Sequence, residues 1–203
     1  MAGRYDLPAR LLARVDARRL AGPVYRFIGS RFLARPLSSA GSRLHGGRFN
    51  PPGAFEVLYT ALTAQTALAE REGILLTTPG IRLARDVRTG VLLRIHCRLA
   101  RVLDLRDARA REQLRVSLAS LLGPWLPWTA ESGAGMRHAL APSQRLGLAV
   151  YEGRRFEAIL YPSAKDPRGS CLAIFPDRLR RGSRVRVHDP EGVIRAALGI
   201  GER

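Results

Sequence analysis

The spacing of apolar residues along the chain predicts an α/β (α+β) fold, with a mixed central sheet and flanking helices. Apolar residues recur at helical spacing in four segments, which are residues 6–20, 64–76, 108–122 and 144–151. Short apolar or alternating runs, typical of strands, occupy residues 24–28, 57–60, 91–105, 156–161, 171–175 and 185–188. Residues 192–203 predict a weak terminal helix.

Helix-capping and helix-breaking residues place the ends of these segments. Asp6 and Pro8 favour a helix start, and Gly22-Pro23 is expected to end the first helix. Thr63 is expected to cap the second helix. Its buried stripe would consist of Ala64, Ala67, Leu68 and Leu75. Glu70 falls on the flank of this stripe, where it either lines a cleft or pairs on the surface with Arg71 or Arg82.

Two segments are expected to be irregular. Residues 29–47 are rich in Gly, Ser and Arg, and such a loop either orders around a ligand or stays mobile. Residues 123–143 contain several Pro, Trp and Gly residues. They predict a long excursion that serves as a lid, an insertion or a partner surface.

The strands at 156–161 and 171–175 are expected to form a hairpin with Ser163 at its mouth. Ser163 would either contact a ligand or only cap the turn. Arg26, in the middle of the predicted strand at 24–28, is either a solvent-facing edge residue or a ligand contact.

The most specific segment is His45–Gly53, which reads His-Gly-Gly-Arg-Phe-Asn-Pro-Pro-Gly. The two glycines permit a tight turn and a close approach to a ligand, while Arg48 carries a fixed positive charge. Tyr59 and Glu70 follow from the next strand and helix, so a cation, an aromatic ring and a carboxylate can converge. An ordinary surface turn remains the alternative.

Composition favours one globular domain with an unusual charge. The chain has 203 residues, 46% of them hydrophobic, and a net charge of +17. Since Lys165 is the one lysine among 34 cations, 33 are arginines (34 − 1), scattered along the chain. This charge reflects either an anionic partner or a coding bias towards arginine.

Few other function classes are supported by the residues. No apolar run approaches the ~20 residues that span a membrane, and no signal core precedes the domain, so a cytoplasmic protein is expected. Cys97 and Cys171 are expected to be buried free thiols. The four histidines, His45, His96, His138 and His188, lack metal-ligand spacing, so no metal site is predicted, and His96 is expected to be structural.

Several motifs occur in one order along the chain and together carry a family resemblance. They are Val24-Tyr25-Arg26, the His45–Gly53 block, Val57-Leu58-Tyr59-Thr60-Ala61, Ala67-Leu68-Ala69-Glu70 and Leu160-Tyr161-Pro162-Ser163. In this combination the chain resembles the RES-domain family, and the Gly-Gly-Arg-aromatic-Asn-Pro-Pro-Gly block is the specific part. The resemblance implies a single RES-like domain over residues 1–203. Its core would span about 22–176, and residues 177–203 would form a basic C-terminal segment.

The resemblance also implies an activity and a partner. Family members are toxins of bacterial toxin–antitoxin pairs whose fold is similar to that of ADP-ribosyltransferase toxins. They consume NAD as a substrate, by phosphorolysis with inorganic phosphate or by ADP-ribosyl transfer to a protein. An Xre-type helix-turn-helix antitoxin, which itself binds the nucleic acid, blocks the site, so an oligomeric complex with it is expected.

By the same resemblance, the catalytic residues would be Arg48, Glu70 and Ser163. Arg26 and Tyr59 would bind the substrate, and His45 would help to shape the loop. Two other hypotheses stay open at this point: a basic nucleic-acid-binding module without NAD activity, and a non-catalytic member that binds NAD without turnover.

Overall fold

The computed structural model describes residues 9–77, 89–125 and 140–199. Its strands are β1 (Arg18–Gly29), β2 (Leu58–Ala61), β3 (Gly90–Asp104), β4 (Ala158–Pro162), β5 (Ser170–Ile174), β6 (Arg184–Val187) and β7 (Ala197–Leu198). Its helices are α1 (Ala9–Arg14), α2 (Ala40–His45), α3 (Ala64–Thr77), α5 (Ala108–Leu114), α6 (Leu118–Leu122) and α8 (Pro142–Glu152). Short 3-10 turns occupy Ser30–Phe32 and Pro176–Arg178.

The strands form one mixed sheet that closes on itself. Its order is β1-β2-β5-β4-β3-β6-β7, and β1 also pairs with β3, so the first five strands form a ring. The β3–β4 pair is parallel, while the other pairs are antiparallel. The predicted fold class, a mixed central sheet with flanking helices, is confirmed.

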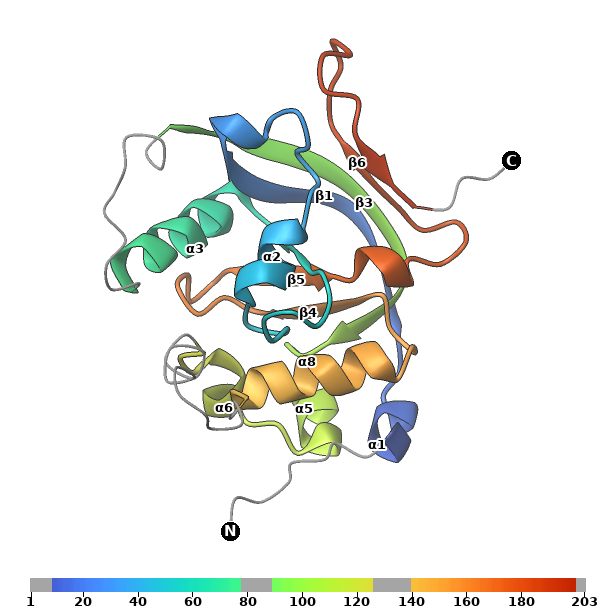
Figure 1. Cartoon of the computed structure of the whole chain (residues 1–203). Coiled ribbons are helices and arrows are strands. Elements are labelled where there is room, and N and C mark those ends of the chain that lie inside the picture. The colour runs from blue at the N-terminus through green and yellow to red at the C-terminus, as the bar shows by residue number, and fades with distance from the viewer. Residues whose placement is uncertain (1–8, 78–88, 126–139, 200–203) are drawn as a thin grey trace.

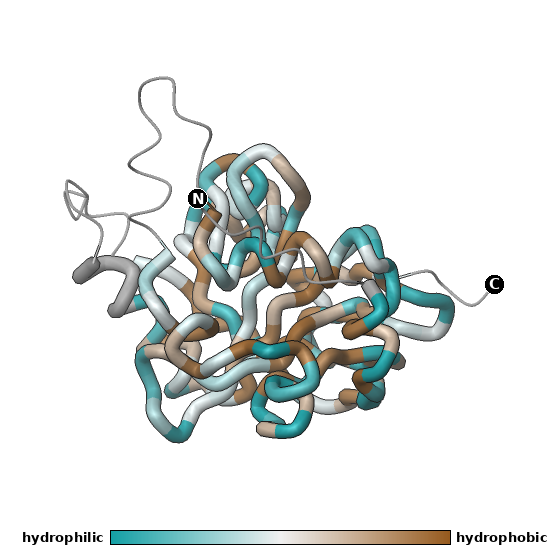
Figure 2. Tube along the Cα trace, turned by 90° about the horizontal axis from the view of Figure 1, so that it is seen from below, coloured by the Kyte–Doolittle hydropathy of each residue, from teal (hydrophilic) through white to brown (hydrophobic). Residues whose placement is uncertain are grey.

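Two apolar clusters follow from the alternation of side chains along these strands. One fills the inside of the ring, with Val24, Leu58, Ile95, Leu160 and Leu172 among its members. The other packs the outer face of the strands against α1, α5, α6 and α8, which gather on one side of the molecule (Figure 1). Apolar stretches run through the middle of the chain trace, while many outer loops are hydrophilic (Figure 2).

Most predicted elements are confirmed. The runs at 24–28, 57–60, 91–105, 156–161, 171–175 and 185–188 correspond to β1 to β6, and those at 64–76 and 144–151 correspond to α3 and α8. Thr63 caps α3 as expected, since its Oγ1 accepts from the backbone N–H of Thr66 at 3.1 Å. Cys97 and Cys171 are buried free thiols.

The predicted helix over 6–20 is wrong beyond Arg14, and residues 1–8 lie outside the described part. Leu20 and the Gly22-Pro23 pair lie within β1, which pairs with β3 from Leu20 to Gly29. Gly22 adopts a φ of +143°, which a residue without a Cβ accepts readily. Long-range strand pairing therefore overrides the local helix and turn signals here.

Four smaller expectations are also corrected. The helix over 108–122 is two helices, because Arg115 ends α5 in the left-handed region at φ 56°. The loop 29–47 contains α2, and the described part of the 192–203 tail forms β7 in place of a helix. Leu68 is 38% exposed and does not belong to the buried stripe of α3.

Two further points concern the surface and the undescribed segments. His96 is exposed on β3 and not part of an apolar interior. Of the predicted excursion at 123–143, residues 126–139 lie outside the described part. Among the helices that are described, none has the length and apolar character needed to span a bilayer.

Asp104 at the end of β3 generates a prediction about pH. Burial alone raises the pKa of Asp104, but hydrogen bonds from Arg106 and Arg18 bring this pKa below its usual value. A lowered folded-state pKa stabilises the fold above the unfolded value near about pH 4, and this stability is lost as the pH falls through the folded-state pKa. Asp104→Asn should therefore cost about 1 kcal/mol at pH 7, because both arginines are partly exposed, and should reduce the loss of stability in acid.

Urea unfolding at neutral and acidic pH measures both effects. Asp107→Asn is the matched control, because Asp107 is exposed and caps α5, a task that Asn also performs. Parallel stability–pH curves for Asp104→Asn and the wild type would contradict the prediction.

Candidate active site

The glycine-arginine segment forms a tight turn with Arg48 and Phe49 at its apex. Gly47 N donates to Asn50 O at 2.8 Å, and Asn50 N donates back to Gly47 O at 3.4 Å. Gly46 enters the turn with φ 73°, in the region that favours glycine. Phe49 is fully buried, so its ring anchors the turn while Arg48 stays partly exposed.

The buried side chain of Asn50 joins this turn to strand β2. Its Nδ2 donates to the carbonyls of Ser42 and Phe55, at 2.7 and 3.1 Å. Its Oδ1 accepts from the Tyr59 hydroxyl at 2.8 Å. These bonds satisfy the buried amide of Asn50 and so compensate for its removal from water.

Tyr59 packs beneath the turn and holds its backbone. The hydroxyl of Tyr59 accepts from Phe49 N at 2.9 Å. A Cβ on Gly47 would lie 2.6 Å from the Tyr59 ring, so only glycine fits there. Burial raises the pKa of Tyr59, although the Phe49 hydrogen bond and Arg48 oppose this, and the phenol remains a neutral donor.

Helix α8 supports the turn from its other side. Gln144 Nε2 donates to Gly47 O at 3.1 Å. A Cβ on Gly147 would lie only 1.9 Å from Phe49 O, so the helix and the turn touch through backbone atoms. Glycine at 147 is what permits this close approach.

Arg48 is tied down by one nitrogen of its guanidinium. Nη1 donates to the carbonyls of Leu121 and Gly123, both at 2.9 Å, at the C-terminal end of α6. Nε and Nη2 make no hydrogen bond within the described residues. The Arg48 side chain is therefore fixed in place and keeps donors for an anionic ligand.

Glu70 on α3 receives three donors on one oxygen. Ser163 Oγ donates to Glu70 Oε1 at 2.5 Å, and Ala164 N donates to the same atom at 3.2 Å. Cys171 Sγ lies 3.6 Å from it. Oε2 accepts no hydrogen bond from the described residues and can face a ligand.

Ser163 caps the turn, as one of its two predicted roles requires, and it also bonds to Glu70. Its Oγ accepts from Lys165 N at 3.1 Å and from Asp166 N at 2.9 Å, so it caps the β4–β5 turn. At the same time it donates to Glu70. The turn is fixed to α3 by a second bond, from Thr66 Oγ1 to Asp166 Oδ2 at 2.7 Å.

Tyr161 lies between the Arg48 turn and the Glu70–Ser163 pair. The sequence analysis did not select it as a site residue. Its ring packs edge-on against Phe49, with centroids 4.7 Å apart. Burial raises the pKa of Tyr161, as do Cys171, Tyr59 and Glu70, whereas the Arg48 guanidinium lowers it. Through Phe49, Tyr161 therefore joins the Arg48 turn to the strand that leads to Ser163. The signal was present, since Tyr161 is two residues before Ser163 and so shares its face of the strand.

Arg26 and His45 do not join this cluster. Arg26 lies on the same face of β1 as Val24 and Ile28, which face the inside of the ring, and its guanidinium donates to the carbonyls of Pro36 and Ser38, at 3.2 and 2.9 Å. Burial lowers the pKa of Arg26 to about 10, so it stays charged at neutral pH. His45 is exposed at the end of α2.

The alternative role of Glu70 was a surface ion pair with Arg71 or Arg82. Arg71 stacks on the Phe27 ring, 3.8 Å from its centroid, and Arg82 lies outside the described residues. Nowhere in the described part do three or more His, Cys, Asp or Glu side chains come together as metal ligands.

The contact between Gly147 and Phe49 generates a prediction. Gly147→Ala should push α8 and the Arg48 turn apart and lower the free energy of unfolding by about 1–3 kcal/mol. Gly41→Ala is the control, because a Cβ there meets nothing within 4 Å and the residue is helical. Thermal unfolding of both variants measures the difference, and equal midpoints would refute a tight contact.

Comparison with known proteins agrees with this description. A structure described as the M. tuberculosis MbcT–MbcA toxin–antitoxin complex contains a similar chain, with a TM-score of 0.66 and 22% identity. The match covers 89% of this chain and 88% of that one, and it shows a shared fold. A comparison with curated protein sequences found no match. The RES domain matches residues 23–196, which is most of the sequence. The chain therefore belongs to the RES-domain family.

Proposed function

We propose that this protein is the toxin of a toxin–antitoxin pair and an enzyme that consumes NAD by cleaving the bond between nicotinamide and ribose. Membership of the RES-domain family supports the proposal, as does the likeness to a chain of a toxin–antitoxin complex. The observation that carries it is the cluster in which Ser163 holds the Glu70 carboxylate, while Tyr161, two residues before Ser163, packs against Phe49 of the Arg48 turn.

One carboxylate is enough for this reaction. Nicotinamide in NAD carries a positive charge on its ring, so the C–N bond breaks with its electron pair going to nitrogen, and the leaving group departs neutral. No general acid is needed, in contrast to ordinary glycosidases with their two carboxyl groups. Positive charge gathers on the ribose in the transition state, and Glu70 would stabilise it.

The hydrogen bonds to Glu70 suit this role. Because Ser163 and the Ala164 N–H occupy Oε1, the carboxylate is held in one orientation with Oε2 available for a ribose hydroxyl or the developing charge. A fixed carboxylate needs no reorganisation as the charge develops, which is what preorganised electrostatic catalysis requires.

Arg48 would bind the pyrophosphate of NAD. A guanidinium presents donors in a planar fork that matches phosphate oxygens, and Nε and Nη2 of Arg48 remain for that purpose. The Tyr59 hydroxyl is already used by Asn50 and Phe49, so its contribution would be the ring, which stacks against the nicotinamide or ribose region.

Inorganic phosphate is the acceptor in the proposed reaction. A phosphate oxygen forms the new bond to the ribose carbon that nicotinamide leaves, and the product is ADP-ribose-1″-phosphate. Transfer to a protein side chain is the alternative within the same chemistry. Because Arg26 is bound to backbone carbonyls on the other face, Arg48 is the cation that this proposal uses.

The proposed partner is an Xre-type helix-turn-helix antitoxin in the cytoplasm. The antitoxin would assemble with the toxin and cover the site, and it would carry the DNA-binding element of the complex.

Glu70→Gln should lose about 100- to 1,000-fold in NAD consumption while the fold is kept, because the amide still accepts from Ser163 but has no charge. Nicotinamide release measured by chromatography gives the rate. Glu152→Gln is the matched control, since Glu152 is exposed at the end of α8. Full activity of Glu70→Gln would remove Glu70 from the mechanism.

Mass spectrometry of the product tests the acceptor. With phosphate present, ADP-ribose-1″-phosphate should form and the rate should rise with phosphate concentration. Release of free ADP-ribose at a phosphate-independent rate would contradict phosphorolysis while leaving NAD cleavage in place.

Arg48→Lys should raise KM for NAD about tenfold with a smaller change in kcat. The point charge remains, but the forked hydrogen bonds and the ties to Leu121 and Gly123 are lost. Steady-state kinetics at saturating phosphate separates the two constants. An unchanged KM would show that Arg48 does not bind the substrate.

A further inference from the structure

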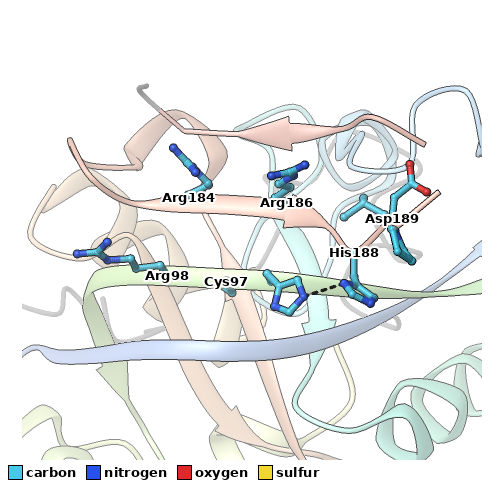
Figure 3. Close-up of a pocket in the computed structure, with 9 residues that line it drawn as sticks. Cys97, Arg98, Arg184, Arg186, His188 and Asp189 are labelled. Atoms are coloured by element: carbon cyan, nitrogen blue, oxygen red, sulfur yellow. Dashed lines mark hydrogen bonds between the residues drawn. The ribbon is translucent and has the colours of Figure 1, made fainter. Parts of the chain in front are cut away.

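A second group of basic side chains, of arginine and histidine, lies on the outside of β3 and β6, away from the Glu70 cluster. Alternation along the two strands buries Ile95, Cys97, Val185 and Val187 and exposes the residues between them. The exposed residues define what we term the β3–β6 basic face, which consists of His96, Arg98, Arg184, Arg186 and His188 (Figure 3).

Strand register places these side chains in a ladder. Arg98 lies opposite Arg184, and His96 lies opposite Arg186. Successive pairs are two residues apart, which is about 7 Å along a strand. The side chains line an open pocket of about 390 Å³, so a ligand group has access to them.

Little negative charge offsets these cations. The pocket lining contains one carboxylate, that of Asp189, and its Oδ2 accepts from the backbone N–H of Ile194. The guanidinium groups of Arg98, Arg184 and Arg186 make no hydrogen bond to any described residue. His96 Nε2 and His188 Nδ1 lie 3.0 Å apart, so the two rings hold each other in place.

The side chains of this face match a phosphate polymer better than a protein partner. Protein interfaces have cores enriched in aromatic and apolar residues and depleted in charge, whereas Pro190 is the one exposed apolar residue in this lining. Single-stranded nucleic acid is bound by stacking its bases on aromatic rings, and this lining contains two imidazoles but no Phe, Tyr or Trp. Regularly spaced guanidinium groups suit the repeating charge of a duplex backbone.

We propose that the β3–β6 basic face binds the phosphate backbone of double-stranded nucleic acid without reading its sequence. The overall charge of +17 would attract the duplex, and this face would hold it by charge-assisted hydrogen bonds. The inference is independent of NAD cleavage, because none of these side chains belongs to the Glu70 cluster.

Replacement of three arginines tests the proposal in the full-length protein. The variant Arg98→Ala/Arg184→Ala/Arg186→Ala is compared with the wild type by fluorescence anisotropy, using a labelled DNA duplex of about 20 base pairs at about 50 to 200 mM salt. We expect affinity to fall at least about tenfold at the lower salt concentration and the dependence of log K on log salt to become shallower by about 2 to 3, because each phosphate contact contributes about 0.9.

A second triple variant controls for net charge. Arg10→Ala/Arg14→Ala/Arg109→Ala also removes three exposed arginines, but from α1 and α5 on the other side of the molecule (Figure 1). It should bind the duplex within about twofold of the wild type. Equal loss in both triples would overturn the proposal, because diffuse charge would then explain the binding.

Two further measurements keep the test decisive. A second duplex of scrambled sequence should bind equally well, and a poly-glutamate peptide of matched charge should bind much more weakly. Preference for the peptide, or for one DNA sequence, would overturn the proposal. Glu70→Gln should retain duplex binding, so a failure of the proposed NAD chemistry would be recognised separately.

Discussion

The buried amide of Asn50 is the interaction on which the candidate site depends. Its three partners are the Ser42 carbonyl of α2, the Phe55 carbonyl of the following loop and the Tyr59 hydroxyl from β2, so one side chain joins the Arg48 turn to the sheet. An unpaired amide in this fully buried position would cost about 1–3 kcal/mol, which makes any other arrangement of the turn unfavourable. The orientation of Arg48 therefore follows from a residue that needs no contact with a ligand.

Two supports from distant parts of the chain hold the elements that carry Arg48 and Glu70. On one side α8 meets the Arg48 turn through Gly147, with backbone against backbone. On the other side the β4–β5 turn is bonded to α3 through Ser163 and Thr66. Both supports connect to one sheet, since Tyr59 in β2 holds the Arg48 turn and Ser163 directly follows β4. This arrangement suits a preorganised site.

Local signals in the sequence predicted the elements that are determined by neighbouring residues along the chain. The β4–β5 hairpin, α3 with its Thr63 cap and the convergence of the Arg48 turn with Tyr59 follow from alternation, capping and turn chemistry. Long-range pairing with β3 places Gly22-Pro23 in a strand. The left-handed conformation of Arg115 divides a segment that has helical spacing throughout. The place of Arg26 on the inner face depends on register, as does that of Tyr161 on the outer face, and a single sequence does not fix how a ring of strands closes.

The order in which the site residues occur along the chain has a consequence for synthesis. Arg48, Tyr59 and Glu70 precede residue 80, whereas Tyr161, Ser163 and Cys171 follow residue 160, and β2 pairs with β5 across this gap. When only the first half of the nascent chain has emerged from the ribosome, Glu70 lacks its Ser163 partner, and the ring of strands lacks β4 and β5. The bond between Glu70 and Ser163 and the pairing of β2 with β5 therefore form only after translation has passed β5.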